Sequence, residues 1–243
     1  MKIYIASHKK FEIPNNQLYT PLYVGGNEIL CERGIHDNTL DNISELNNAY
    51  CELTALYWIW KNSDENIVGL VHYRRYFKIG NKILEKQDVE NILKSHSIIV
   101  TKKRNYFITS IEKHYEKAHV KEDLELTRKI IIDLFPDYID SYNKVMKGSS
   151  ISLYNMFVTD SITLSNYCDW LFKIIDLVYE RLDITKYDQY QKRVIGFLSE
   201  RLFNVWIDKN IEPSKIKYLD VINTDGEDKF KKGLNLIKRH FLG

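Results

Sequence analysis

The sequence is poor in cysteine, proline and glycine. Its three cysteines, Cys31, Cys51 and Cys168, are far apart and form no CxxC motif and no Cys/His cluster with the spacing of a zinc site. Such a sparse, odd number is typical of a reducing compartment. With 10 glycines and 4 prolines in 243 residues, the chain has no internal repeat and no linker-like segment that would mark a domain boundary.

Long apolar runs are missing as well. No stretch approaches the ~20 residues that a helix needs to cross a bilayer, and the first apolar stretch is too short for a signal peptide. We therefore expect a cytoplasmic protein, with any membrane contact peripheral and at the inner face of the plasma membrane. The net charge of +2 provides no broad basic face, which argues against a nucleic-acid-binding protein.

Several catalytic motifs are absent. The sequence contains no Walker A loop, no GxGxxG and no GxSxG. It also contains no Asp-x-Asp, which is the metal clamp of many nucleotide-sugar enzymes. Arginine and histidine side chains can neutralise a leaving diphosphate instead. The sequence therefore identifies no metal ligands and leaves dependence on Mn²⁺ or Mg²⁺ open.

The residues that are present suit one well-packed domain, because 44% are hydrophobic and 28% are charged. Short apolar runs and helical periodicity alternate along the chain, which predicts an α/β fold. The predicted strands are residues 2–6, 67–71, 97–101, 154–159 and 217–222. The predicted helices are residues 42–61, 86–95, 113–147 with an interruption at Pro136, 165–182 and 189–208.

Polar side chains follow two of the predicted strands. Residues 7–9 follow the first strand, and His72-Tyr-Arg-Arg75 follows strand 67–71. Ligands of open α/β sheets bind beyond the carboxyl ends of strands, and guanidinium groups match phosphate oxygens. On an extended backbone, His72 and Arg74 would point to one side and Arg75 to the other. The pattern favours an anion-binding site over structural ion pairs.

The helix predicted at 189–208 carries unusual polar residues. Arg201 falls inside its apolar arc and needs a partner there, while Glu200 and Arg193 share an adjacent face. Gly196 costs about 1 kcal/mol in a helix, which the close approach of a ligand or of another backbone would explain. Helix packing with a structural Arg–carboxylate pair explains the pattern equally well.

Two further groups of polar residues have simpler explanations. Asn42, with Glu45 three residues later, forms a capping box for the helix at 42–61. Asp41 remains a candidate ligand contact, because helix N-termini attract polar ligands. The segment 114–123 holds two histidines and several acids, and we interpret it as a solvated helix face rather than a metal site.

Long motifs in the chain resemble those of a bacterial family of formerly unknown function that occurs in capsule, exopolysaccharide and O-antigen gene clusters. The segments that carry the resemblance are Asp41–Lys61, Gly69–Phe77, Asn155–Phe157, Tyr167–Phe172 and Arg193–Leu202, in that order. Ser7-His-Lys9 and Tyr19-x-Pro21 fit as well. The resemblance therefore covers nearly the whole chain, to about residue 207.

Members of that family are regarded as glycosyltransferases, and some resemble inverting galactofuranosyltransferases that use a UDP donor. The resemblance implies one α/β, GT-A-like domain over residues 1–228, with a mixed central sheet flanked by helices. It also implies transfer of a hexose, galactofuranose or another, from a UDP-sugar to the acceptor of a surface polysaccharide. A lipid-linked oligosaccharide or a glycan is the expected acceptor.

Within this resemblance, we expect Glu200 to be the general base that takes the proton of the acceptor hydroxyl. Asp188 is the alternative base, and His72 is expected to stabilise the leaving diphosphate. The expected donor-binding residues are Ser7, His8, Lys9, Asp41, Asn42, Arg74, Arg75, Asn155, Arg193 and Arg201.

Residues 229–243 are expected to form a basic, amphipathic tail. Its apolar face and lysine-rich flanks are typical of a helix that lies on a membrane, although a packed C-terminal helix explains them equally well. Two other functions stay open for the chain as a whole. One is a non-catalytic carbohydrate-binding or assembly subunit of a polysaccharide synthesis complex, and the other is a phosphate-ester hydrolase that uses the same cationic pocket.

Overall fold

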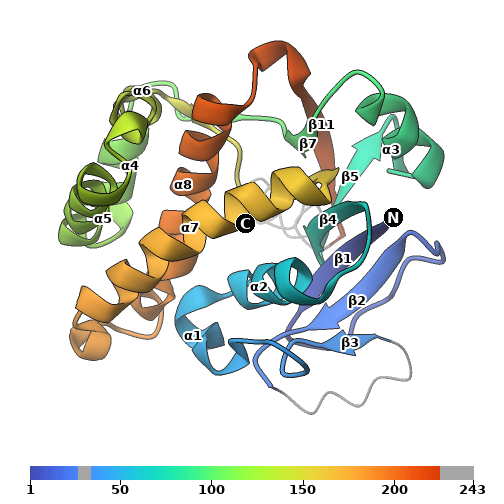
Figure 1. Ribbon diagram of the computed structural model, residues 1–243, viewed down its shortest axis with the longest axis horizontal. Coiled ribbons are helices and arrows are strands. Elements are labelled where there is room, and N and C mark those ends of the chain that lie inside the picture. Colours follow the sequence, from blue (N-terminus) through green and yellow to red (C-terminus); the bar gives the residue numbers. More distant parts are fainter. Residues whose placement is uncertain (27–33, 225–243) are drawn as a thin grey trace, which may run out of the picture.

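The computed structural model describes residues 1–26 and 34–224, whose main sheet is mixed and has the strand order β3-β2-β1-β4-β10-β7-β11-β5-β6 (Figure 1). Its strands are β1 (Lys2–Ser7), β2 (Tyr19–Tyr23), β3 (Ile35–His36), β4 (Ile67–His72), β5 (Arg75–Ile79), β6 (Lys82–Ile83), β7 (Ile98–Thr101), β10 (Phe157–Asp160) and β11 (Ile216–Asn223). A small second sheet pairs β8 (Arg104–Asn105) with β9 (Ser150–Ile151). The predicted tail at 229–243 and the domain boundary at 228 lie outside the described residues.

The strand directions bring several chain segments to one edge of the sheet. β1 pairs in parallel with both β2 and β4, so the carboxyl ends of all three strands lie together. β10 runs antiparallel to β4, with Phe157 opposite Leu70, so the residues before β10 reach the same edge. β4 turns directly into β5, and His72 pairs with Arg75 across that hairpin.

Eight α-helices are found among the described residues. They are α1 (Asn47–Tyr50), α2 (Leu53–Asn62), α3 (Lys86–Leu93), α4 (Ile111–Ala118), α5 (Lys121–Leu134), α6 (Ile139–Lys147), α7 (Ser161–Arg181) and α8 (Val194–Asn210). Figure 1 shows α4, α5 and α6 grouped beside α8, on the side remote from β1, β2 and β3. The long helix α7 packs against α2, α5 and α8 and joins this helical group to the sheet.

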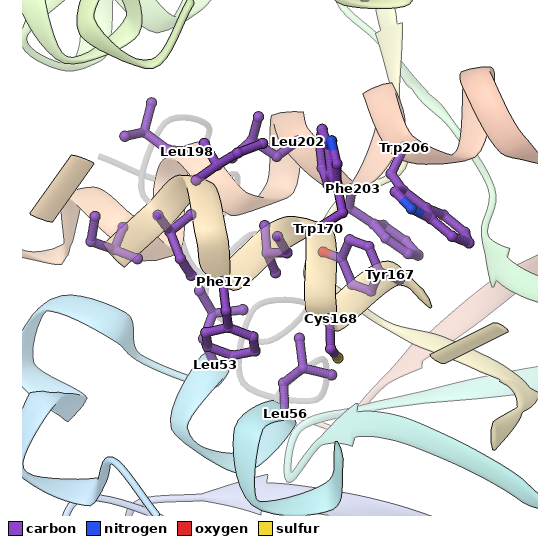
Figure 2. Close-up of a cluster of buried hydrophobic side chains, with 14 of the residues drawn as sticks. Leu53, Leu56, Tyr167, Cys168, Trp170, Phe172, Leu198, Leu202, Phe203 and Trp206 are labelled. Carbon is purple, nitrogen blue, oxygen red and sulfur yellow. The ribbon is translucent and has the colours of Figure 1, made fainter. Parts of the chain in front are cut away.

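Side chains of the strands alternate between two cores. Along β1, Tyr4 and Ala6 face the core that α1, α2, α7 and α8 cover, whereas Ile3 and Ile5 face the core beneath α3. Figure 2 shows the first core, in which α7 contributes side chains toward both α2 and α8. Burying each such large apolar side chain stabilises the fold by about 1.5–3 kcal/mol.

The structure corrects the helix predicted at 42–61. Cys51 adopts φ 54° and ψ −129°, outside the helical region, and separates α1 from α2. A 3₁₀ turn at Ser44–Leu46 comes first, so Asn42 and Glu45 form no capping box. Instead, Asn42 Oδ1 accepts a hydrogen bond from the backbone N–H of Ser44 at 3.2 Å, which closes a local turn.

The prediction of an extended backbone after strand 67–71 is also wrong. Tyr73 and Arg74 form a tight turn between β4 and β5, so His72 and Arg75 lie opposite each other and on one face of the sheet.

Sequence patterns also failed to show β2, which contains Pro21. β3 pairs with β2 only at Leu22 and Tyr23, so this proline lies where β2 has an open edge.

Candidate active site

A cleft of about 520 Å³ opens at the edge of the sheet where β1, β2 and β4 end. Its other walls are the junction between α1 and α2, the segment before β10 and the beginning of α8. Parallel strands end at this edge, which is where α/β sheets bind ligands. The predicted site residues that line the cleft are Ser7, His8, His72, Arg74, Arg75, Arg193 and Glu200.

Three other predicted residues lie next to the cleft without lining it. Lys9 borders an adjoining hollow of about 540 Å³ that shares Arg74 with the cleft. Asn155 is 2% exposed and Arg201 is 3% exposed, so both are buried behind the cleft wall. Asn155 and Arg201 therefore contact the cleft only indirectly, through Glu52 and Glu200 respectively.

The remaining three predicted residues lie elsewhere. Asp41 is exposed and accepts the hydroxyl of Tyr57 at 3.1 Å. Asn42 forms the local turn described above, because the chain becomes helical only after Ile43. Asp188 is exposed, and its Oδ1 accepts the backbone N–H of Gln191 at 2.7 Å. These three side chains are engaged in local structure and do not line the cleft.

The positively charged side chains, here called the cationic side of the cleft, are Arg74, Arg75 and Arg193 in its lining and Lys9 in the adjoining hollow. The guanidinium carbon of Arg75 lies 4.2 Å from the ring centre of Tyr154, and no carboxylate of the described residues forms an ion pair with Arg75. Burial lowers the pKa of His8, and the nearby charges of Lys9, Arg74 and Arg193 lower it further. A site with this potential attracts anions.

Two consecutive residues before β10 have left-handed backbone conformations. Tyr154 has φ 75° and Asn155 has φ 50°, which is uncommon for residues other than glycine. The backbone N–H of Tyr154 donates to Glu200 Oε1 at 2.8 Å, and its carbonyl accepts His72 Nε2 at 2.6 Å. Arg75 stacks on the ring of Tyr154, so Tyr154 contacts three of the predicted site residues, His72, Arg75 and Glu200.

Glu52 is a cleft residue that the sequence patterns did not reveal. Its Oε1 accepts Asn155 Nδ2 at 2.8 Å, and the same amide donates to Ser199 Oγ at 2.9 Å. Glu52 follows Cys51, whose positive φ breaks the helix and exposes Glu52 to the cleft. Because the break was not predicted, Glu52 could not be separated from other polar positions of the helix at 42–61.

Gly196 allows the α1–α2 junction to approach α8. A Cβ atom at this position would lie 3.1 Å from Cys51 Sγ and 3.2 Å from Cys51 Cβ, tighter than ordinary van der Waals contact. Gly196 was predicted to allow the close approach of a ligand or of another backbone. The close neighbour is Cys51 of the same chain. This contact brings Glu52 and Glu200 into the same cleft.

Glu200 is held from two sides. Its Oε1 accepts the backbone N–H of Tyr154, and its Oε2 accepts a hydrogen bond from Arg201 Nη1 at 3.0 Å. Arg201 also donates to the carbonyl of Phe197 at 2.9 Å, so the partner that this buried arginine needs is present. Burial raises the pKa of Glu200 and the charge of Glu52 adds to the rise, whereas Arg201, the Tyr154 N–H and Arg75 oppose it.

The segment 114–123 is not the solvated face that we predicted. His119 packs on the ring of Phe197 at 4.1 Å, and burial lowers its pKa to about 4. Asp123 is buried and accepts the hydroxyls of Tyr187 and Tyr115. In the part of the chain that the structure describes, no three or more His, Cys, Asp and Glu side chains gather as metal ligands.

The fold closely matches one that is known from a glycosyltransferase structure. The apo structure of the bifunctional glycosyltransferase WbbM matches this chain with a TM-score of 0.84 and 31% identity, over 91% of this chain and 45% of that one. This chain thus spans less than half the length of WbbM. The match confirms the predicted α/β fold with a mixed central sheet.

The chain belongs to the family described as Domain of unknown function (DUF4422), whose model matches residues 2–211. The mannosyltransferase Ktr4p of S. cerevisiae matches with a TM-score of 0.34 and 12% identity, over 85% of this chain and 62% of that one. That likeness is too low to bear on the fold. No curated protein sequence matches the chain. Within residues 1–26 and 34–224, no helix has the length and apolar character to span a bilayer.

Proposed function

We propose that this domain is a glycosyltransferase that moves a sugar from a nucleotide-sugar donor to the acceptor of a surface polysaccharide. One observation carries the proposal: in a fold like that of WbbM, a single cleft combines Arg75, which has no carboxylate ion-pair partner among the described residues, with the hydrogen-bonded carboxylates Glu52 and Glu200. Cations suit a departing diphosphate, and a carboxylate suits the proton of the attacking hydroxyl. The family resemblance supports a UDP donor, with galactofuranose or another hexose as the sugar.

The cationic side of the cleft would bind the donor. Ser7 and His8 lie at the end of β1, where the nucleotide would enter, and Lys9 extends this side into the adjoining hollow. Arg74 and Arg75 would contact the diphosphate and stabilise the charge that develops on it. His72 already donates to the carbonyl of Tyr154, so it would act by fixing the residue on which Arg75 stacks.

Glu200 would be the general base of an inverting displacement. The acceptor oxygen attacks the anomeric carbon as the bond to the diphosphate oxygen breaks, and Glu200 takes the acceptor proton. Its raised pKa makes it a stronger base near neutral pH than an exposed carboxylate. The hydrogen bonds from Tyr154 and Arg201 fix its orientation, and each oxygen keeps a second lone pair.

A thermal-shift screen against nucleotide sugars tests the proposal, with Mn²⁺ and with EDTA in parallel. A UDP-sugar at 100 times its Kd should raise Tm by about 5–10 °C, because it binds only the folded chain. UDP release should then require an acceptor. Glycan binding without any nucleotide-sugar response would indicate a carbohydrate-binding subunit, and phosphate release without an acceptor would indicate a phosphate-ester hydrolase. Either result would overturn the proposal.

Glu52 gives a pH prediction for the same reaction. Its negative charge helps to raise the pKa of Glu200, and Glu200 must be ionised to accept a proton. Removing that charge in Glu52→Gln lowers the pKa of Glu200, so the acidic limb of the kcat/KM profile should move to lower pH. The exposed Glu45→Gln serves as the control and should leave the limb in place. An unmoved limb in Glu52→Gln would show that Glu200 is not the titrating group.

A further inference from the structure

The loop between β8 and α4 presents two large apolar side chains to solvent. Phe107 is 83% exposed and Ile108 is 99% exposed, and they are adjacent at the tip of the loop. Other strongly exposed apolar residues of the described chain, such as Leu40 and Ile162, have no such neighbour beside them. An exposed apolar pair of this kind marks a surface that contacts another molecule or a membrane.

The loop holds these side chains outward by specific contacts. The N–H of Phe107 donates to Asn105 Oδ1, and the N–H of Tyr106 donates to the carbonyl of Ser149, both at 2.7 Å. The ring of Tyr106 stacks on His114, with 3.9 Å between ring centres. Phe107 has φ 57°, a conformation that costs free energy in a residue with a side chain. The tip is therefore a fixed part of the fold.

Basic residues flank the apolar tip. Lys102, Lys103 and Arg104 lie shortly before it in the sequence and are exposed, and Lys113 is exposed on the following helix. Between residues 102 and 113 the only acidic residue is Glu112. Outside this segment, Asp220 lies 3.7 Å from Lys102, and such an exposed pair contributes little. The surface thus combines two exposed apolar side chains with several positively charged side chains near them in the sequence.

We propose that residues 102–108 form a membrane-docking surface for an anionic lipid bilayer. Phe107 and Ile108 enter the interfacial layer, where their apolar surface leaves water, and the basic side chains lie against the anionic headgroups. Aromatic and aliphatic side chains beside lysine and arginine are the composition that such interfaces favour. Apolar burial and electrostatic attraction each contribute only modestly, so binding is reversible and weakens with added salt.

The position of this surface connects it to the cleft. Tyr154 lines both the cleft and a hollow of about 200 Å³ whose other walls include Lys102, Lys103 and Arg104. Burial raises the pKa of the Tyr106 hydroxyl; the charge of Arg201 lowers this pKa and that of Glu200 raises it, so this hydroxyl lies within electrostatic range of both residues. Docking therefore brings the bilayer to the Glu200 side of the cleft. That consequence rests on the proposed function, since it would present a lipid-linked acceptor to the base.

Vesicle flotation of the full chain, without donor or acceptor, tests the docking surface independently of catalysis. Vesicles of phosphatidylcholine with phosphatidylglycerol should bind the chain, and pure phosphatidylcholine vesicles should bind it less. The double variant Phe107→Ser/Ile108→Ser should lower the partition coefficient on the order of 10-fold or more. The matched control Leu40→Ser/Ile162→Ser, which removes two separate exposed apolar side chains, should bind like the wild type.

Equal vesicle binding by the tip variant and the wild type would place the contact elsewhere and overturn the inference. Absence of vesicle binding by the wild type would also overturn it. If light scattering showed a dimer that the tip variant loses, the surface would instead join two copies of the chain. Sugar transfer to a water-soluble acceptor should be unchanged in the tip variant, so failure of the docking surface and failure of the proposed enzyme give different results.

Discussion

Replacing Glu200 by glutamine is expected to lower kcat by about 10²–10⁴-fold while donor binding persists. Glutamine has nearly the same shape and can still accept the N–H of Tyr154, but it cannot take a proton from the acceptor hydroxyl. The proposed donor contacts come mainly from the cationic side chains of the cleft, which the substitution leaves in place. Steady-state kinetics with saturating acceptor, together with a UDP-sugar titration of the variant, measure the two quantities separately.

The substitution also removes the negative partner of Arg201, so loss of fold must be separated from loss of the base. Breaking a buried ion pair typically costs about 3–5 kcal/mol, and a thermal unfolding curve would show how much is lost here. The matched control is Asp188→Asn, which alters an exposed carboxylate outside the cleft and should leave kcat unchanged. Near-normal turnover in Glu200→Gln would remove Glu200 from the role of base.

The placement of the cleft followed from local patterns and one general rule. The apolar runs at β1 and β4 are short and end in polar residues, so their carboxyl ends could be located without a structure. Once both strands are parallel neighbours, Ser7 and His72 must lie at the same edge. The long periodic helices α7 and α8 were likewise predicted, because their apolar faces are continuous; their ends were placed closely, whereas the predicted starts at 165 and 189 differ from the observed Ser161 and Val194.

The residues that complete the cleft depend on contacts distant in sequence. Glu52 faces the cleft because Cys51 has a positive φ, and that backbone is accommodated where Gly196 leaves space on α8. Tyr154 links His72 and Glu200 through its backbone, and Asn155 positions Glu52. Single-sequence patterns report periodicity and composition, whereas these conformations are imposed by tertiary packing.

Arg75→Gln tests the cationic side of the cleft. The guanidinium group of Arg75 stacks on Tyr154 and has no carboxylate ion-pair partner in the described part of the chain, so its charge is available to the departing diphosphate. Removing one such group that stabilises developing charge typically lowers kcat by about 10²–10³-fold. Arg75→Lys should recover part of the loss, because lysine keeps the charge but lacks the planar fork and stacks less well.

The readouts are kcat with saturating donor and the affinity for UDP alone. Both should fall in Arg75→Gln, and kcat should fall more, because charge on the diphosphate increases in the transition state. The matched control is Arg128→Gln, which removes an exposed arginine from α5 and should change neither quantity. A variant that binds UDP and turns over like the wild type would show that the leaving group departs without Arg75, and the cationic role would then fall to Arg74, Arg193 and Lys9.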